Sequence, residues 1–287
     1  MLVVQQPQET RQKNQRQAMN LAHNVSDDDY CISAIPAFDD NYLWLLQRGQ
    51  RAAVIDPGDG DAVIQQLERR QLTLDYILIT HHHPDHTGGI EQLQQRYGAE
   101  VIGPDSARIP QVTTVVGEGE KLPRLGLTLD VISVPGHTLD HIAYFIATPN
   151  PLGSAVLFCG DTLFAGGCGR VFEGSYEQMH HSLNKLKQLP RETLIYCAHE
   201  YTEANLRFAL QVEGENPALL ARAESVAEQR ARGEATVPSS LAEELASNPF
   251  LRCDKTAVIA AAETRLGQPV ASSDVVFATI RRWKDGN

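Results

Sequence analysis

The 287-residue chain lacks the long apolar segments and the excess of positive charge that mark several classes of protein. No run approaches the roughly 20 apolar residues that span a bilayer, and the first residues lack the apolar core of a signal peptide. Only 25 Lys and Arg stand against 36 Asp and Glu, which gives a formal charge of −11. Nucleic acid binds to a basic face, so this balance disfavours it as a partner. We expect a soluble monomer that binds a small molecule and no membrane.

Cysteines are also few, and their odd number and wide spacing do not suit a disulfide framework. Several lie in apolar runs, where a thiol packs as a small hydrophobic group. This usage favours a reducing compartment, and we expect the protein in the cytoplasm. The five cysteines are Cys31, Cys159, Cys168, Cys197 and Cys253.

Composition divides the chain into three parts. Residues 1–29 are rich in Gln, Asn, Arg and Asp, and they are predicted to form a poorly ordered extension, with a basic targeting peptide as the alternative. Residues 30–200 alternate short apolar runs with polar turns and amphipathic stretches, which is typical of an α/β fold. Residues 201–287 carry helical patterns with little strand signal. We expect a helical, substrate-binding domain there.

Periodicity places the individual elements. Short apolar runs predict strands over 42–46, 52–55, 76–80, 131–134, 144–147, 155–159 and 193–197. Amphipathic spacing predicts helices over 61–70, 90–97 and 176–189. Two capping patterns predict helix starts in the last third of the chain, at Asn216-Pro217 and at Ser240 with Glu243 three residues later.

The densest group of candidate ligands is the segment His81-His82-His83-Pro84-Asp85-His86. The apolar run before it predicts that a buried strand delivers these side chains into one tight loop. Imidazoles and carboxylates packed so closely lose hydration when buried and repel one another when they carry like charges. A bound cation relieves both penalties. His81, His83, Asp85 and His86 are therefore candidate metal ligands.

Three more candidate ligands follow predicted strands. His137, Asp161 and His199 each come within a few residues of the end of an apolar run. Ligands of open sheets collect in the crevice beyond the strand ends. We therefore expect the loops that carry these three side chains to converge with the His81 loop on one site.

Seven candidates are too many for one ion, because zinc prefers about four ligands. They suit two ions with a hydroxide between them. Zinc is favoured, and the same His and Asp ligands also accept iron or manganese. The assignment gives the first metal His81, His83 and His137, the second metal Asp85, His86 and His199, and both metals the bridging Asp161.

The order of these ligands resembles the metallo-β-lactamase superfamily. The motif His81-x-His83-x-Asp85-His86, followed by His137, Asp161 and His199, carries the resemblance over roughly residues 31–201. It implies an αββα sandwich with a dinuclear site at one edge of the sheets. The superfamily hosts many reactions, so this fold by itself does not identify the substrate.

Four further segments resemble glyoxalase II, the hydroxyacylglutathione hydrolases. They are residues 35–42 (IPAFDDNY), 159–164 (CGDTLF), 199–202 (HEYT) and 248–252 (NPFLR). Together with a helical C-terminal domain, this resemblance covers nearly everything after residue 30. It implies that the substrate glutathione is held at the positions Arg170, Phe172, Tyr201, Arg252 and Lys255. Phe172 stands where the family often has Tyr, and Arg170 where it often has Lys.

The resemblance implies hydrolysis of S-(2-hydroxyacyl)glutathione, such as S-lactoylglutathione, to a 2-hydroxy acid and glutathione. This is the second step of methylglyoxal detoxification in that family. A metal-bound hydroxide suits the role of nucleophile, because zinc lowers the pKa of bound water to about 7. The glutathione thiol, with a pKa of about 8.5, leaves without a strong general acid. Asp85 and Asp161 are assigned catalytic roles through the metals.

Two other functions are compatible with the same candidate residues. The site would also suit another hydrolase of the same fold, acting on a lactone, a β-lactam or a phosphodiester. A metal-filled scaffold that binds glutathione conjugates without turnover is the non-enzymatic alternative. The segment 248–252 favours glutathione, and the complete ligand set favours an enzyme.

The remaining histidines are given structural roles. Alternation points His82 away from the metals, and His141 is expected to hydrogen-bond nearby without taking part in catalysis. His180 and His181 are expected at the surface of a helix. Asp56 ends another apolar run, where it either orients a ligating histidine or forms a simple turn.

Overall fold

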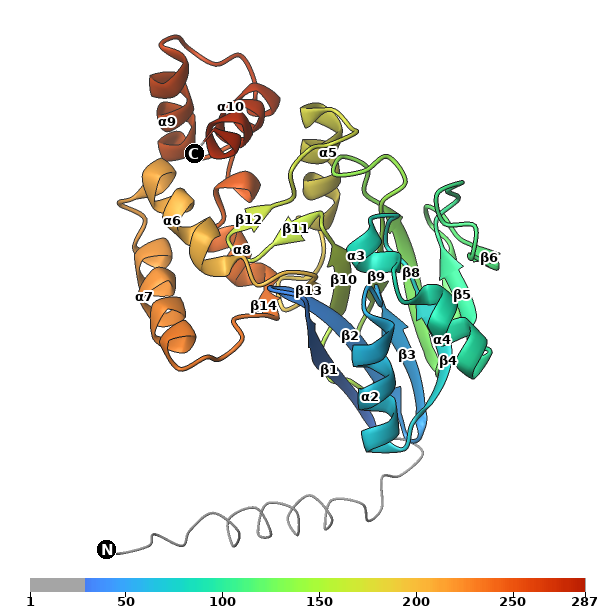
Figure 1. The fold of residues 1–287 in the computed structure, drawn as a ribbon. Coiled ribbons are helices and arrows are strands. Elements are labelled where there is room, and N and C mark those ends of the chain that lie inside the picture. Colours follow the sequence, from blue (N-terminus) through green and yellow to red (C-terminus); the bar gives the residue numbers. More distant parts are fainter. Residues whose placement is uncertain (1–28, 287) are drawn as a thin grey trace, which may run out of the picture.

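The structure is a computed structural model that describes residues 29–286. The predicted N-terminal extension, apart from Asp29, lies outside the described residues. None of the described helices is long and apolar enough to cross a bilayer. The described strands form two six-stranded sheets and one small hairpin (Figure 1).

The first sheet collects the strands from the beginning of the described chain. Its outer pairs β1–β2 and β2–β3 are antiparallel, and β3 to β6 run parallel. The strand β1 escapes prediction because Pro36 interrupts its pattern, and proline is tolerated at the edge of a sheet, where β1 lies. In order across the sheet the strands are β1 (Tyr30–Ala37), β2 (Asn41–Arg48), β3 (Arg51–Ile55), β4 (Thr73–Leu78), β5 (Glu100–Gly103) and β6 (Thr114–Val115).

The second sheet is mainly antiparallel, with one parallel pair between β10 and β13. Its edge strand β14 comes from the helical last third of the chain and is only two residues long. Across the sheet the strands are β14 (Ser239–Ser240), β13 (Leu194–Cys197), β10 (Val156–Gly160), β9 (Ile142–Ile146), β8 (Leu127–Ser133) and β7 (Lys121–Arg124). The hairpin joins β11 (Leu163–Phe164) to β12 (Gly167–Cys168).

The helices cover the outer faces of the two sheets. Helices α2 and α4 lie against the first sheet, and the later helices gather at the other side of the molecule (Figure 1). The described helices are α2 (Gly60–Arg70), α3 (Pro84–Thr87), α4 (Ile90–Tyr97), α5 (Tyr176–Leu186), α6 (Thr202–Glu213), α7 (Pro217–Ala231), α8 (Leu241–Ser247), α9 (Thr256–Leu266) and α10 (Ser273–Asp285), with a 3-10 turn η1 (Pro249–Leu251).

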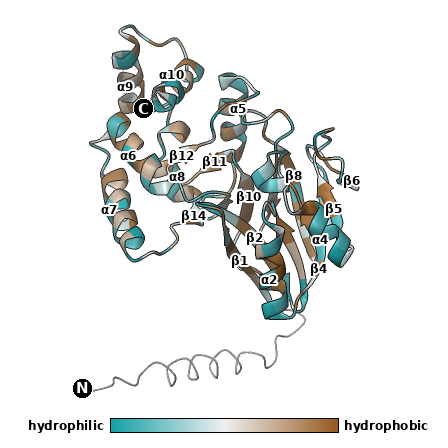
Figure 2. Cartoon of the chain, in the orientation of Figure 1, coloured by the Kyte–Doolittle hydropathy of each residue, from teal (hydrophilic) through white to brown (hydrophobic). Residues whose placement is uncertain are grey.

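Alternation along the strands builds this layered arrangement. In β2, Leu43 and Leu45 face α2 and α4, while Trp44 and Leu46 face the second sheet. The strands are therefore apolar on both faces, and polar residues lie mostly on the outer sides of the helices (Figure 2). On the far side of the second sheet, α5 buries Met179 and Leu183, which share one helix face. The predicted αββα sandwich is confirmed.

The predicted helix starts are also confirmed. The Asn216 side chain accepts hydrogen bonds from the backbone N–H groups of the first turn of α7, and Ser240 does the same for α8. Helix α6 begins at Thr202. The last third is helical apart from β14, and the domain boundary between residues 200 and 201 stays a prediction.

A buried polar network joins the helical part to the β11–β12 hairpin. The Glu244 carboxylate is fully buried and accepts hydrogen bonds from the Gly166 N–H at 2.9 Å and the Arg222 guanidinium at 2.5 Å. Asn248 Nδ2 donates to the same carboxylate at 3.0 Å and to the Gly167 carbonyl at 2.9 Å. The polar groups of the hairpin tip are thus satisfied by helices far away in the sequence.

Replacing Arg222 with Met should lower the free energy of unfolding by about 3 to 5 kcal/mol, because it leaves the Glu244 carboxylate buried without its cation. Urea denaturation at matched metal content measures this change. The control is Arg207→Met on the surface of α6, where the ion pair with Glu203 is exposed. That change should alter stability by less than about 0.5 kcal/mol. Equal effects of the two substitutions would contradict the expectation.

Candidate metal centre

The His81 loop is held in place by Asp56, at the end of β3. The Asp56 carboxylate accepts the Thr80 N–H at 2.7 Å and the Thr80 hydroxyl at 2.8 Å. Pro84 then opens the one-turn helix α3, where its missing N–H is no loss. Next to this turn, a Cβ at Gly58 would lie 1.8 Å from the Asp85 carbonyl oxygen. Only glycine therefore lets the β3–α2 loop pack against the loop that carries the candidate ligands.

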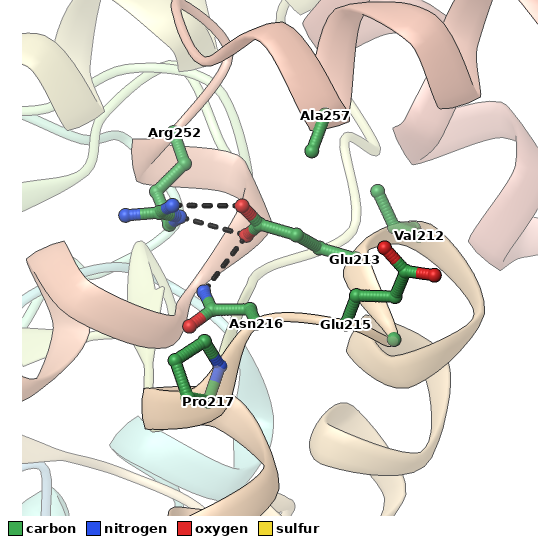
Figure 3. A pocket seen from close by; sticks show the side chains of 8 residues that line it. Val212, Glu213, Glu215, Asn216, Pro217, Arg252 and Ala257 are labelled. Atoms are coloured by element: carbon green, nitrogen blue, oxygen red, sulfur yellow. Dashed lines mark hydrogen bonds and ion pairs between the residues drawn. The ribbon is translucent and has the colours of Figure 1, made fainter.

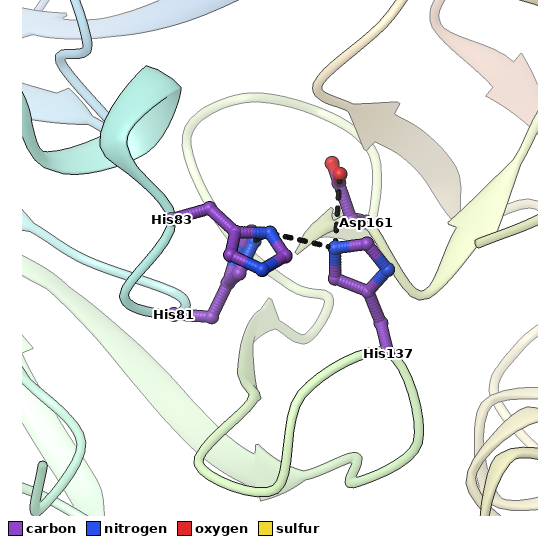
Figure 4. Close-up of side chains that lie close together, drawn as sticks. All are labelled: His81, His83, His137 and Asp161. Atoms are coloured by element: carbon purple, nitrogen blue, oxygen red, sulfur yellow. Dashed lines mark hydrogen bonds and ion pairs between the residues drawn. The ribbon is translucent and has the colours of Figure 1, made fainter. Parts of the chain in front are cut away.

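The first group of side chains comes from three loops (Figure 4). His83 Nδ1 lies 3.1 Å from His81 Nε2 and 3.0 Å from His137 Nε2. His137 Nε2 in turn lies 3.3 Å from Asp161 Oδ2. Each of the four side chains offers one ligand atom, and these atoms all lie within 4.8 Å of one another. Any two ligands of the same ion must lie this close together.

The second group gathers beside the first and shares one carboxylate with it. Asp85 Oδ2 lies 3.5 Å from His86 Nε2 and 3.4 Å from His199 Nε2. Both imidazoles also lie 3.4 Å from Asp161 Oδ1. The two oxygens of Asp161 thus face different groups, which is the geometry of a bridging carboxylate. The structure brings together all seven side chains that the sequence nominated.

Unsatisfied polar atoms indicate that this cluster suits cations. Among the described residues, His86 Nε2 and Asp161 Oδ1 are buried without a hydrogen-bond partner. Buried polar atoms are normally satisfied, so each such exception needs an explanation. Imidazole nitrogens and carboxylate oxygens are the donors that zinc, iron and manganese accept. The residues present therefore fit two divalent ions.

A second set of contacts orients the histidines through their other ring nitrogens. Asp56 Oδ2 lies 3.1 Å from His86 Nδ1, which supports the orienting role over a simple turn. Asp40 Oδ1 lies 2.8 Å from His199 Nδ1. The sequence analysis did not predict a role for Asp40. Its loop reaches the centre only through the tertiary β-bridge between Asn41 and His199.

The charges of the cluster show how protons occupy it without a metal. Burial lowers the pKa of His81, His83 and His137 below the ordinary histidine value. Burial acts in the same direction on His199, but hydrogen bonds to Asp161 and Asp85 outweigh it and raise its pKa to about 10. Cation binding must therefore release protons from this side of the cluster.

The remaining histidines divide between confirmed and wrong predictions. His82 lies 2.8 Å from Asp140 and turns to Arg108, away from the seven side chains, as predicted. His141 is buried, stacks on His81 and accepts the Asp161 N–H at 3.1 Å. His180 was predicted at the surface, and this is wrong. It is 4% exposed because it bonds Asp274 and stacks on Phe277, which ties α5 to α10.

Three of the five predicted glutathione positions lie beside the cluster. Tyr201 stacks on His199 with ring centroids 4.7 Å apart. Phe172 lies edge-on to His137 at 5.3 Å and is 61% exposed. Arg170 lies over the Phe172 ring at 5.9 Å.

The other two positions pair with acidic side chains. Arg252 forms a bidentate ion pair with Glu213, at 2.7 and 2.8 Å, in a separate pocket at the end of α6 (Figure 3). Lys255 is half exposed, with Nζ 3.2 Å from Asp254. The glutathione contacts expected of Arg252 and Lys255 stay predictions.

A different basic cluster adjoins the centre. Arg281 donates to the Cys168 carbonyl at 3.0 Å, and its Nε is buried without a partner among the described residues. Lys284 donates to Asn205 in the first turn of α6. Burial lowers the pKa of Lys284 to about 8, and the charges of Arg281 and Arg170 act in the same direction. The sequence offered no signal for this cluster beyond two cations on a predicted helical segment.

Comparison with known proteins agrees with this arrangement. Residues 38–199 match the family described as the metallo-beta-lactamase superfamily, and residues 200–287 match the family described as hydroxyacylglutathione hydrolase C-terminus. A protein from Pseudomonas fluorescens named hydroxyacylglutathione hydrolase is 49% identical over 257 residues, which cover 88% of this chain and 98% of that protein. One of the same name from Ectopseudomonas mendocina is 50% identical with the same coverage.

Solved structures share the fold. The BLEG-1 B3 metallo-beta-lactamase superposes with a TM-score of 0.58 at 22% identity, over 77% of this chain and 99% of that one. ETHE1 from Myxococcus xanthus gives 0.59 at 25% identity, over 89% and 98%. These likenesses and the two matched families account for the sandwich and for the helical part that follows it. The chain belongs to the hydroxyacylglutathione hydrolase family within the metallo-beta-lactamase superfamily.

Proposed function

We propose that the protein hydrolyses S-(2-hydroxyacyl)glutathione, with S-lactoylglutathione as its first substrate, to a 2-hydroxy acid and glutathione. This reaction is the second step of methylglyoxal removal. One observation carries the proposal: a carboxylate, Asp161, stands between two groups of imidazoles next to a basic cluster on the C-terminal helix. The relatives named hydroxyacylglutathione hydrolase share nearly the whole length of the chain.

The metal sites follow from the two groups. His81, His83 and His137 would hold one ion, Asp85, His86 and His199 would hold the other, and Asp161 would serve both. Zinc is the proposed ion, with iron or manganese accepted by the same donors. Bound divalent ions supply a nucleophile at neutral pH by lowering the pKa of water, and they polarise the thioester carbonyl.

The residues around the ions position the substrate. Asp85 is partly exposed and remains ionised, because the adjacent imidazoles of His199 and His86 and the hydrogen bond from Asn41 outweigh burial and hold its pKa below the ordinary value. Asp85 and Asp161 thereby stay in the ligating state. The departing thiolate needs no acid, since its pKa is about 8.5. This inventory suits a thioester better than an amide, whose nitrogen would need a proton.

Glutathione carries two carboxylates and therefore requires cations near the centre. Arg170, whose ion pair with Asp285 is exposed, and Lys284 supply them, with Phe172 and Tyr201 on the path to the metals. Arg281 is buried against Asp285 and holds this part of α10 in place. In place of the contact predicted for Arg252, we assign that residue a structural role, because its ion pair with Glu213 is largely buried whereas that of Arg170 is exposed.

The setting of the reaction completes the proposal. The net charge of −11 disfavours nucleic acid, and the substrate is a small molecule. All five cysteines are free thiols, four of them buried, which suits a reducing cytoplasm. We propose that the protein acts there as a monomer.

Replacing Asp161 with Asn should lower kcat for S-lactoylglutathione by more than about 100-fold. Changing even a residue that touches the metal only through a ligand typically lowers metal affinity or activity by about 10- to 100-fold. Loss of thioester absorbance measures the rate, and elemental analysis should show fewer than two ions per chain. The control is Asp130→Asn, a carboxylate paired with Lys121 at the surface. Full activity after removal of the metals by a chelator would contradict the proposal.

Replacing Lys284 with Met should raise KM for S-lactoylglutathione by about 10- to 100-fold, the strength of a hydrogen bond to a charged group. Lysine binds a carboxylate only when protonated, and its pKa here is about 8. KM of the unaltered protein should therefore rise as pH passes above 8, and this rise should be absent from the variant. Arg252→Met should lower the melting temperature and leave KM unchanged. The reverse pattern would restore Arg252 as a substrate contact.

Replacing His141 with Leu should weaken metal binding by about 10- to 100-fold, because the Asp161 backbone loses the acceptor that fixes it. His141→Gln places an amide oxygen near the lost nitrogen and should restore part of the affinity. Titration with zinc in a competing chelator measures both. Identical metal affinities in the two variants would show that His141 only fills space.

A further inference from the structure

Three large apolar side chains are exposed around the metal centre. Phe38 is 59% exposed, Leu139 is 58% exposed and Phe172 is 61% exposed. Phe38 lies two residues from Asp40, which contacts His199, and Leu139 lies two residues from His137. Phe172 contacts His137 directly. Among the described residues, the other exposed large hydrophobics lie away from these loops, at Val115, Leu220, Leu266 and Val275.

Phe172 and Leu139 project from backbone that is firmly held. The His137 carbonyl accepts the Phe172 N–H at 3.2 Å, and the Gly136 carbonyl accepts the Gly174 N–H at 3.1 Å. The Leu139 N–H donates to the Glu173 carboxylate at 3.0 Å. Glu173 is itself bound by Arg108, which also contacts His82. The loops at residues 136–139 and 172–174 are thus hydrogen-bonded to each other, and they hold Leu139 and Phe172 exposed to solvent.

Phe38 stands on the other side of the centre, in the turn between β1 and β2. Its φ is 51°, a left-handed conformation that is unfavourable for a bulky side chain. The same turn carries Asp40, which binds His199, and Asn41, which donates to Asp85 at 3.0 Å. Strain of this kind is tolerated at functional sites when the surroundings enforce it.

A large apolar side chain that stays exposed gains little from folding, and several of them gathered around one site favour a role in ligand binding. The two ends of the proposed substrate differ in chemistry. The charged glutathione end belongs with Arg170 and Lys284, and Phe172 lies between Arg170 and the histidines. The acyl end, beyond the carbonyl, has no charge to satisfy.

We propose that Phe38, Leu139 and Phe172 form an apolar rim that contacts the substituent on the acyl carbon of the substrate. This inference rests on the proposed thioesterase function and adds a substrate class to it. Thioesters of 2-hydroxy acids with hydrocarbon side chains are preferred over S-glycolylglutathione, which has none. Phe172 serves both ends, and Phe38 and Leu139 serve the acyl end.

The test compares S-glycolyl-, S-lactoyl- and S-mandeloylglutathione, whose acyl substituents are hydrogen, methyl and phenyl. Each kcat/KM is divided by the rate of alkaline hydrolysis of the same thioester, which removes differences in intrinsic reactivity. The variants are Leu139→Ser and Phe38→Asn, since Asn accepts the left-handed backbone. Each should lower kcat/KM for the mandeloyl substrate by about 10-fold, the effect of lost apolar contact in a pocket. S-Glycolylglutathione should change less than twofold.

The control substitution is Leu220→Ser, at a 48% exposed position on α7 away from the centre. It should leave all three substrates unchanged. Binding supplies a readout without turnover: calorimetry should show that S-benzylglutathione binds more tightly than S-methylglutathione to the unaltered protein, and that Leu139→Ser removes this advantage.

The outcomes separate the two proposals. Absence of hydrolysis of all three thioesters by the metal-loaded protein would overturn the proposed function. Hydrolysis with normalised kcat/KM values within twofold of one another, or equal losses on all substrates in the variants, would overturn the rim alone. If a variant does not fold, the selectivity of the unaltered protein and its binding of the two conjugates still decide the matter.

Discussion

The arrangement depends on one buried carboxylate, Asp161, which stays ionised between two groups of imidazoles. A charge removed from water requires partners on every side. His141 accepts the backbone N–H of Asp161, and the neighbouring glycines leave room for its chain. A Cβ at Gly169 would lie 1.9 Å from the Asp161 carbonyl oxygen, and one at Gly160 would lie 2.4 Å from the Thr80 hydroxyl. The backbone that presents Asp161 is therefore packed too closely to admit other residues.

The helical part of the chain completes this site rather than merely adjoining it. The hairpin after Asp161 leaves backbone groups unpaired at its tip, and a buried group of that kind is costly. Asn205 donates to the Ala165 carbonyl at 3.0 Å, and Glu244 accepts the Gly166 N–H. Because these residues come from α6 and α8, the orientation of the metal loop and the position of the C-terminal cations are set together.

The surroundings of the centre differ in chemistry from one side to the other. Arg281 and Lys284 on α10 and the exposed Arg170 gather three cations around one carboxylate, Asp285, on a protein of negative net charge. Apolar side chains occupy the loops around His137 and Asp40. The loops around the centre therefore present charged side chains on one side and apolar side chains on another.

The sequence by itself determined the features that depend only on residues close together in the chain. The spacing from His81 to His86 identified a metal loop, and the ends of apolar runs located His137, Asp161 and His199, because strand periodicity and short-range crowding are local properties. Tertiary structure alone decided which partners the charged side chains meet. Arg252 is neutralised by Glu213 from 39 positions away, while Lys284 meets Asn205 from 79 and Asp40 meets His199 from 159. Contacts over such separations leave no periodic trace, since they arise only when the layers pack.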